Sequence, residues 1–200
     1  MIRVESEGDV LTLTLNRPEK ANALTETMLT ELSGAVGEAR ERVLVLTGAG
    51  NIFSAGADLD EVEGGTLAHS PQWERLSWAV AEFRGLSIAA LNGTVAGGAM
   101  GMVLACDLRL CVPGAKFFYP VMKLGHLPQP TDPRRLSALV GPARAKLILM
   151  GGQKIVSDDA FAFGLVDRVC DAPVEEARAI AADVLAARAD HVTAIKGMIC

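Results

Sequence analysis

The sequence predicts one α/β domain, and two observations carry that prediction. Short apolar runs typical of buried strands alternate along the whole chain with longer segments in which apolar residues recur at helical spacing. Half of the 200 residues are hydrophobic and 22% are charged, which is enough apolar material for one sizeable core. No linker long enough to divide the chain is visible.

The elements of the first half follow from local patterns. Val10–Leu15 alternates apolar residues with threonine and predicts a strand with one buried face. Thr25 is a suitable cap for a helix whose apolar residues share one side. Residues 42–47 are a nearly continuous run of valine and leucine, which is typical of a strand covered on both faces. Residues 61–71 predict a loop, and residues 72–84 a helix.

The second half continues the alternation. A strand is expected at 108–112, and the four prolines between 117 and 133 exclude a long helix there. Asp132 followed by Pro133 predicts a helix start with Asp132 as the cap, for a helix that runs to about residue 150 and is interrupted at 141–142. The remaining elements are a helix from 157 to Gly164, a strand at 165–170, a helix at 173–188 and a final helix from 191.

Residues 87–111 combine glycines and apolar residues with almost no charge, and they admit three interpretations. Gly93, Gly97 and Gly101 stand four apart, as in membrane helices that pack closely. The turn pair Asn92-Gly93 and the amphipathic helices elsewhere argue against a membrane segment. In a soluble domain the glycines either allow close packing or leave backbone N–H groups at Gly97-Gly98 free to hold an anionic oxygen.

A second loop of the same character favours the anion-binding interpretation. Residues 54–58 read Ser-Ala-Gly-Ala-Asp, directly after a predicted strand region. An oxyanion hole needs two donors from separate segments aimed at one point. Two glycine-containing loops in one domain can supply them.

Four motifs in order resemble the crotonase, or enoyl-CoA hydratase/isomerase, superfamily. They are LNRPEKANAL at 15–24, VLTGAGNIFSAGADL at 45–59, NGTVAGGAMGMVLACDLRL at 92–110 and MGGQKIVSDDAFAFGLVDRV at 150–169. The resemblance implies an α/β fold, a crotonase-like spiral of repeated ββα units. In it, residues 1–190 form the acyl-CoA-binding core and residues 191–200 begin a shortened C-terminal helical region. It also implies that the backbone N–H groups of Ala57 and Gly98 hold the thioester carbonyl.

The resemblance further implies the path of the substrate. Lys20, Ala21, Ala55, Asp58 and Leu59 would follow the adenine and pantetheine parts of coenzyme A. A solvated surface lysine remains an equal alternative for Lys20. Coenzyme A would arrive as part of the acyl-CoA substrate, so no permanently bound cofactor is expected. Family members also suggest a homo-oligomer, a trimer or a hexamer.

The sequence departs from the family where its two catalytic glutamates would fall. Those positions hold Gly101 and Val121, which can neither donate nor accept a proton. We therefore expect a lyase or isomerase of this superfamily that uses a thioester enolate for decarboxylation or related chemistry, in place of ordinary hydration. The alternative is a catalytically silent acyl-CoA binder or interaction subunit.

Four side chains near residue 121 are candidates for a replacement acid or base. Gln129 stands where other branches of the family place an acid, but an amide cannot exchange protons at neutral pH. A histidine side chain is a common acid and base in enzymes, and His126 is equally suited to a packing role. Tyr119 and Asp132 complete the set, and for Asp132 a helix cap is the favoured interpretation.

Composition excludes several other classes. The net charge is −5 without any Lys/Arg run, so nucleic acid is not an expected partner. The four cysteines form no CxxC pair and the first residues do not resemble a signal peptide, which predicts a cytoplasmic protein. The three histidines have no metal-binding spacing, so no metal site is expected.

Overall fold

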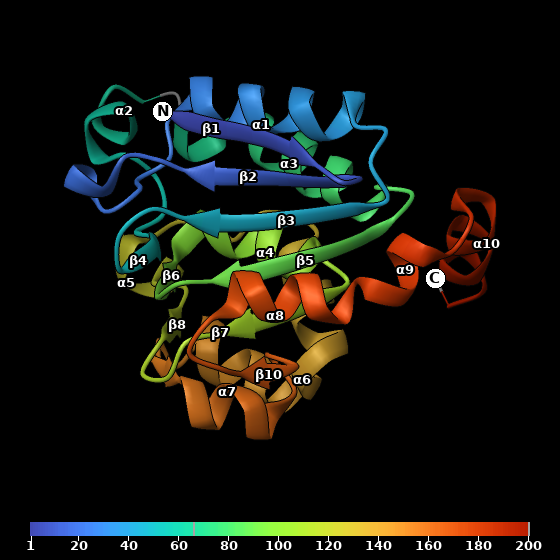
Figure 1. Ribbon diagram of the computed structural model, residues 1–200. Coiled ribbons are helices and arrows are strands. Elements are labelled where there is room, and N and C mark those ends of the chain that lie inside the picture. Colours follow the sequence, from blue (N-terminus) through green and yellow to red (C-terminus); the bar gives the residue numbers. More distant parts are fainter. Residues whose placement is uncertain (66, 200) are drawn as a thin grey trace.

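The computed structural model covers residues 1–200 and describes all of them except Thr66 and Cys200. The strands of this part form two sheets (Figure 1). The larger sheet has the order β1 (Ile2–Glu7), β2 (Val10–Leu15), β3 (Val43–Gly48), β5 (Leu86–Leu91), β7 (Leu108–Cys111) and β10 (Arg168–Val169). The smaller has the order β4 (Ile52–Ser54), β6 (Thr94–Ala96), β8 (Lys116–Phe118) and β9 (Ile155–Val156).

The helices lie between and outside these strands. They are α1 (Glu26–Glu38), α2 (Leu59–Glu63), α3 (Gln72–Ala81), α4 (Met100–Ala105), α5 (Val121–Leu124), α6 (Asp132–Leu149), α7 (Ser157–Phe163), α8 (Pro173–Ile180), α9 (Ala182–Ala186) and α10 (Ala189–Ile199). Short 3₁₀ helices occupy Pro18–Lys20, Leu67–His69 and Gly97–Ala99.

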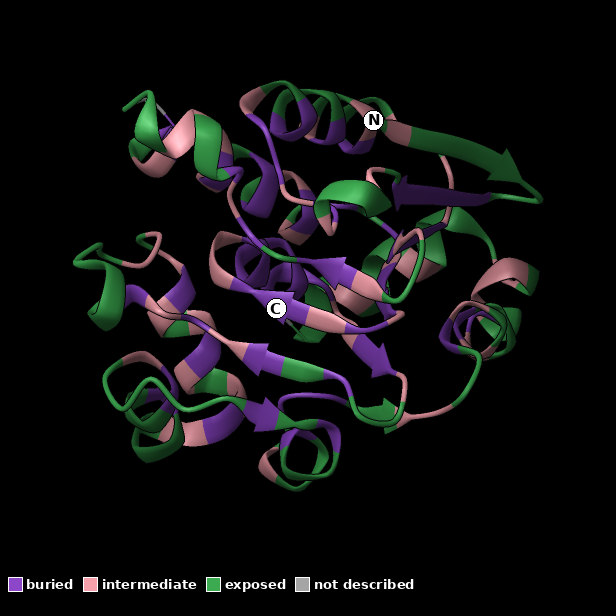
Figure 2. Cartoon of the chain, turned by 90° about the vertical axis from the view of Figure 1, so that its left-hand side faces the viewer, coloured by how far each residue is buried: buried purple, intermediate pink, exposed green. Residues whose placement is uncertain are grey.

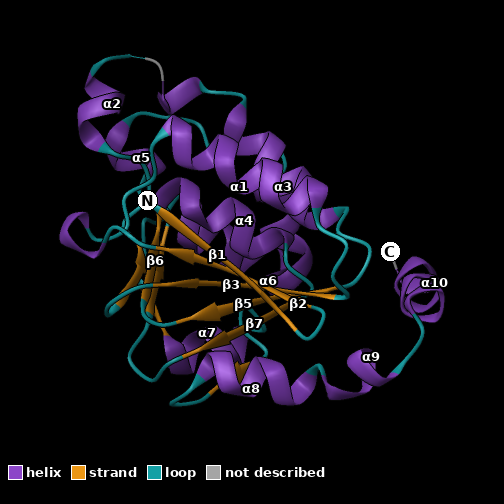
Figure 3. Ribbon diagram, turned by 45° about the horizontal axis from the view of Figure 1, so that its top comes forward, coloured by secondary structure: helices purple, strands orange, loops and turns teal. Residues whose placement is uncertain are grey.

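The spiral of ββα units is confirmed by the way the two sheets share the chain. Each of the pairs β3 and β4, β5 and β6, and β7 and β8 places its first strand in the larger sheet and its second in the smaller. Helices follow each pair before the chain returns to the larger sheet (Figure 3). Successive units pair in parallel, β3 with β5 and β5 with β7, so the ends of these strands meet along one edge.

Helices cover both faces of the larger sheet. On one face α1, α3 and α4 pack over the leucines of β2 and β3, and on the other α8 packs over Val43, Val45 and Ile88 (Figure 1). The predicted one-sided burial of β2 is therefore wrong, because Thr12 and Thr14 are buried as well. The strand covered on both faces is found at β3, as predicted.

Residues 87–111, the stretch rich in glycine and apolar residues, do not form a single helix. They contribute to β5, β6, the 3₁₀ turn Gly97–Ala99 and α4. Gly93 lies at the turn from β5 to β6, where a Cβ atom would stand 2.1 Å from the carbonyl oxygen of Asn51. Only glycine lets the backbones approach so closely. Among the described residues, no helix combines the length and the apolar character needed to cross a bilayer.

Several segments differ from the expected ones, and the strand expected at 165–170 is reduced to β10 at Arg168–Val169. The predicted loop at 61–71 contains the end of α2 and the turn Leu67–His69, and Leu67 is fully buried with its oxygen accepting a hydrogen bond from Trp73 Nε1 at 2.8 Å. The predicted helix at 173–188 divides into α8 and α9. Strand β1 was not expected because its side chains are mostly polar and exposed, and it forms by antiparallel pairing with β2 (Figure 2).

Candidate functional site

A cavity of about 180 Å³ lies where the loop after β4, the turn after β6 and the segment around α5 meet. Most of its walls are apolar. The lining residues relevant to function are Ala55, Ala57, Leu59, Trp73, Gly97, Gly98, Tyr119, Val121, His126 and Gln129. Both proposed oxyanion donors therefore border the same space.

The N–H group of Ala57 is left free by the pairing of its neighbours. Leu24 N donates to Gly56 O at 2.7 Å, and Asp58 N donates to Leu24 O at 2.9 Å. This parallel bridge takes the peptide groups on either side and turns the N–H of Ala57 away from Leu24. Within the described residues, the N–H of Ala57 has no backbone acceptor.

The second donor is brought beside the first by a close contact between loops. Gly56 has φ of 94°, and a Cβ atom there would lie 2.8 Å from the carbonyl oxygen of Ala96. Gly98 follows two residues later, at the start of the 3₁₀ turn, where N–H groups have no acceptor within the helix. A Cβ on Gly98 would lie 3.0 Å from the Trp73 ring, so the indole also limits what can stand there.

Asn22 holds the loop that carries Ala57, and the sequence did not single it out. Its side chain is buried and donates to Ala49 O at 2.9 Å and to Ile52 O at 2.8 Å. The backbone carbonyl of Asn22 accepts a hydrogen bond from Ser54 Oγ at 2.8 Å, and that hydroxyl accepts one from Gly56 N at 3.1 Å. An asparagine is suited to this place because it tolerates the positive φ of 52° found here.

Asp58 stabilises the same loop from the other side. Its carboxylate accepts from Asp60 N at 3.0 Å, which caps α2, and forms a 2.5 Å ion pair with Arg17. The hydrogen bond from Arg17 holds the pKa of Asp58 below its ordinary value. The carboxylate is 4% exposed and does not line the cavity, so the structure gives Asp58 a role in the loop itself.

The other residues predicted to follow coenzyme A divide into two groups. Ala55 and Leu59 line the cavity, and Leu59 is 71% exposed at its mouth. Lys20 and Ala21 lie outside the lining, in the first loop. The Lys20 ammonium is exposed and stands 3.6 Å from Asp60.

His126 and Gln129 both line the cavity, and their roles stay predictions. His126 is exposed, and its ring meets His69 edge to face with 6.1 Å between the ring centroids. The backbone N–H of Gln129 donates to the Tyr119 hydroxyl at 3.3 Å. No carboxylate is among the described residues of the lining.

Asp132 is not the cap of α6, which corrects the favoured sequence interpretation. It is the first residue of the helix, and Thr131 occupies the cap position. Its side chain turns into the protein, where Oδ2 accepts a hydrogen bond from the Tyr119 hydroxyl at 2.9 Å. Burial raises the pKa of Asp132 to about 7, and burial beside this carboxyl also raises the pKa of Tyr119.

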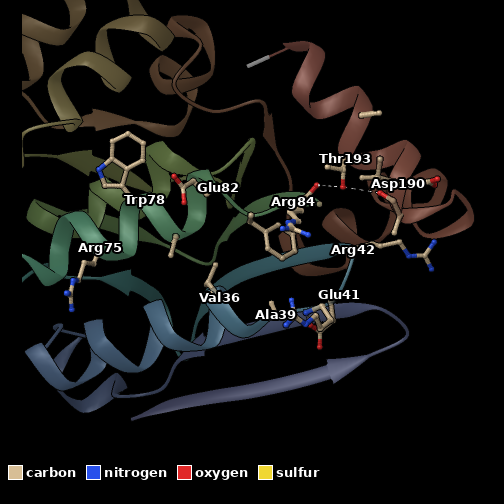
Figure 4. A pocket seen from close by; sticks show the side chains of 18 of the residues that line it. Val36, Ala39, Glu41, Arg42, Arg75, Trp78, Glu82, Arg84, Asp190 and Thr193 are labelled. Atoms are coloured by element: carbon tan, nitrogen blue, oxygen red, sulfur yellow. Dashed lines mark hydrogen bonds between the residues drawn. The ribbon is translucent and has the colours of Figure 1, made fainter.

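A larger groove of about 1130 Å³ lies elsewhere, between α1, α3 and α10 (Figure 4). It shares no lining residue with the cavity of Ala57 and Gly98. Its walls mix charges of both signs, for example Arg75 and Arg84 with Glu41 and Glu82. Because neither Ala57 nor Gly98 borders it, we take the smaller cavity as the candidate site.

The chain is similar to proteins of known family. The Enoyl-CoA hydratase/isomerase family matches residues 5–199. A probable enoyl-CoA hydratase, echA6, of Mycobacterium tuberculosis is 34% identical over 189 residues, covering 92% of this chain and 76% of the relative. A short-chain-enoyl-CoA hydratase of Clostridium acetobutylicum is 35% identical over 179 residues, covering 84% and 68%.

The fold is shared with solved structures as well. DspI of Pseudomonas aeruginosa superposes with a TM-score of 0.93 at 31% identity, covering 99% of this chain and 85% of that one. The family match and the shared fold agree. The chain therefore belongs to the enoyl-CoA hydratase/isomerase family.

Proposed function

We propose that this protein binds an acyl-CoA thioester in the 180 Å³ cavity and stabilises its enolate with the backbone N–H groups of Ala57 and Gly98. One observation carries the proposal: two donors from loops far apart in sequence border one apolar cavity. An enolate oxygen carries more negative charge than a thioester carbonyl. Fixed donors therefore stabilise it selectively, and each is typically worth about 3 kcal/mol.

The walls of the cavity argue against ordinary hydration. Val121 lines it where the resemblance places one catalytic glutamate, and Gly101 stands where it places the other. Adding water across a double bond needs a base for the water and an acid for the carbon. Decarboxylation of a malonyl-type thioester needs only the polarised carbonyl for carbon–carbon cleavage, so it is the reaction we favour.

A second candidate function is acyl-CoA binding without turnover. It is supported by the absence of a carboxylate from the described lining of the cavity. Binding measured by calorimetry, together with no product from any thioester, would favour it over the enzymatic proposal.

The test pairs two substitutions at Ala57. Ala57→Pro removes the N–H donor, and it breaks no backbone hydrogen bond of the described residues because the bridge to Leu24 uses the neighbouring peptide groups. Ala57→Gly keeps the donor and serves as the matched control. Enoyl-, malonyl- and saturated acyl-CoA thioesters are incubated with each protein, and the products are identified by mass spectrometry.

We expect turnover to fall by about 100-fold or more in Ala57→Pro and to stay near that of the unmodified protein in Ala57→Gly. Equal turnover in the two variants would contradict the oxyanion role of this residue. Calorimetric binding of the same thioesters shows whether the proline variant still holds its ligand.

A further inference from the structure

We propose that Tyr119 is the catalytic acid and base of this site, and that Asp132 positions it and stores the exchanged proton. The pair would replace a carboxylate at position 101 with one from the start of α6. This rests on the proposed function, because the proton exchanged is that of the thioester α-carbon.

The first observation is where the Asp132 carboxyl lies. A Cβ atom at Gly101 would stand 3.0 Å from Asp132 Oδ1 and 2.8 Å from Ser77 Oγ. The carboxyl of Asp132 thus fills space that a side chain at position 101 would enter. It reaches that space from α6, whereas a residue at 101 would reach it from α4.

The second observation is that the carboxyl is incompletely bonded. Asp132 is 1% exposed, and its Oδ1 has no hydrogen-bond partner in the described part of the chain. A buried polar atom without a partner destabilises the fold, so its presence calls for an explanation in function. As a helix cap the carboxylate would have accepted backbone N–H groups, and it does not.

The third observation connects this carboxyl to the cavity. Tyr119 lines the cavity, and its hydroxyl donates to Asp132 Oδ2 at 2.9 Å. The hydroxyl also accepts the N–H of Gln129 at 3.3 Å, so two contacts fix its position. The Tyr119 hydroxyl is therefore the single group that connects this residue of the cavity wall with the Asp132 carboxyl.

The proton step balances without any further reactant. The phenolic oxygen takes the proton of the thioester α-carbon while its own proton passes to Asp132 Oδ2. The electron pair of the broken C–H bond enters the enolate, whose oxygen is held by Ala57 and Gly98. In the reverse direction Asp132 returns its proton to Tyr119, and the phenolic proton passes to the α-carbon.

Burial is the main reason why the pKa of Asp132 is raised to about 7. The hydrogen bond from Tyr119 lowers this pKa, Glu74 of α3 raises it and Arg135 of α6 lowers it. Glu74 is held near by accepting hydrogen bonds from Thr131 N and Oγ1, both at 3.0 Å. A group that titrates near neutrality can both give and take a proton at the pH of the cell.

The test measures hydrogen exchange at the α-carbon of butyryl-CoA in D₂O, followed by mass spectrometry. Exchange needs only reversible enolate formation, so it does not depend on which reaction the enzyme completes. We expect Tyr119→Phe and Asp132→Asn each to slow exchange by about 100-fold or more. Asp159→Asn, an exposed aspartate of α7, is the control and should exchange at the unmodified rate.

The pH dependence of exchange separates a proton store from a structural aspartate. The unmodified protein should exchange faster as the pH rises through about 7, because only ionised Asp132 can accept the phenolic proton. Glu74→Gln removes a neighbouring negative charge and should move the midpoint to lower pH. A merely structural Asp132 would leave the midpoint where it was.

The outcomes are distinct. If butyryl-CoA binds but its α-protons do not exchange, or if either site variant exchanges as fast as the unmodified protein, the inference is overturned and thioester binding stands. If butyryl-CoA does not bind at all, the proposed function fails and the inference fails with it. Binding by each variant, measured by calorimetry, shows that a slow variant is folded.

Discussion

At the scale of the residue, Asp132 is a buried side chain whose ionisation destabilises the fold. It keeps a carboxyl group inside the protein with one oxygen unbonded among the described residues, and the pKa of that group rises to about 7. Between pH 4 and 7 the folded chain holds this proton, whereas the unfolded chain has released it. Stability must therefore fall as the pH rises through this interval.

Asp132→Asn should reveal this cost. The amide cannot ionise, so the variant does not lose this stability as the pH rises. Its free energy of unfolding, relative to that of the unmodified protein, should increase between pH 4 and 7 by up to about 4 kcal/mol for roughly three pH units. We expect its melting temperature, relative to that of the unmodified protein, to rise from pH 4.5 to pH 8. A difference in melting temperature that is independent of pH would contradict the raised pKa.

The sequence named several residues that the structure places beside one cavity, and it gave Asp132 the wrong structural position. Ala57 and Gly98 were found because their loops carry recognisable motifs, and both line one cavity. Asp132 was assigned to a cap because an aspartate before Pro133 usually is one. Only the three-dimensional contacts show where its side chain turns: it accepts the Tyr119 hydroxyl and lies beside the backbone of Gly101.

At the scale of the element, the glycines differ in how closely other atoms approach the position that a Cβ atom would take. Gly93 lies where a Cβ atom would come within 2.1 Å of the backbone oxygen of Asn51, so a side chain there must push β4 and β6 apart. Gly34 lies within α1 with nothing within 4 Å of its missing Cβ atom. Identical substitutions at the two positions should therefore have opposite effects.

Gly93→Ala should lower the free energy of unfolding by about 2–4 kcal/mol, since backbone atoms cannot move aside cheaply. Gly34→Ala should raise it by about 0.5–1 kcal/mol, because alanine is the better helix former. Urea denaturation of both variants measures the two changes. A neutral Gly93→Ala would show that the turn between β5 and β6 can open.

The sequence predicted elements where pattern and packing coincide. The cap at Thr25 is confirmed, since its Oγ1 accepts from Met28 N at 3.2 Å, and α7 ends at Gly164 as expected. Strand β1 has too few apolar residues to show a strand pattern in the sequence. It forms because it pairs with β2 in the folded protein. The short strands of the smaller sheet, such as β9, are set by their partners for the same reason.

At the scale of the whole molecule, α10 stands away from the body and is tied to it at few points (Figure 1). The main tie is Lys196, whose Nζ lies 2.7 Å from Asp107 Oδ2 and donates to Gly85 O at 3.0 Å. Asp107 in turn accepts from Ser87 N and Oγ, so the lysine joins α10 to the start of β5.

Lys196→Met should release this helix while keeping its apolar stem. We expect hydrogen–deuterium exchange to rise throughout α10, with a local opening free energy lower by about 1–3 kcal/mol, and to stay unchanged in α4. Lys146→Met, on the exposed side of α6, is the matched control. Unaltered protection of α10 would show that other contacts hold it.

Assembly into a homo-oligomer and the boundary at residue 190 stay predictions.

The space shared by Gly101 and Asp132 has a consequence for the history of the family. Because two positions on different helices compete for one volume, neither can change freely while the other holds a large side chain. A large side chain at position 101 should therefore be tolerated only when residue 132 is small. The pair should drift together in evolution, although thirty-one positions separate them along the chain.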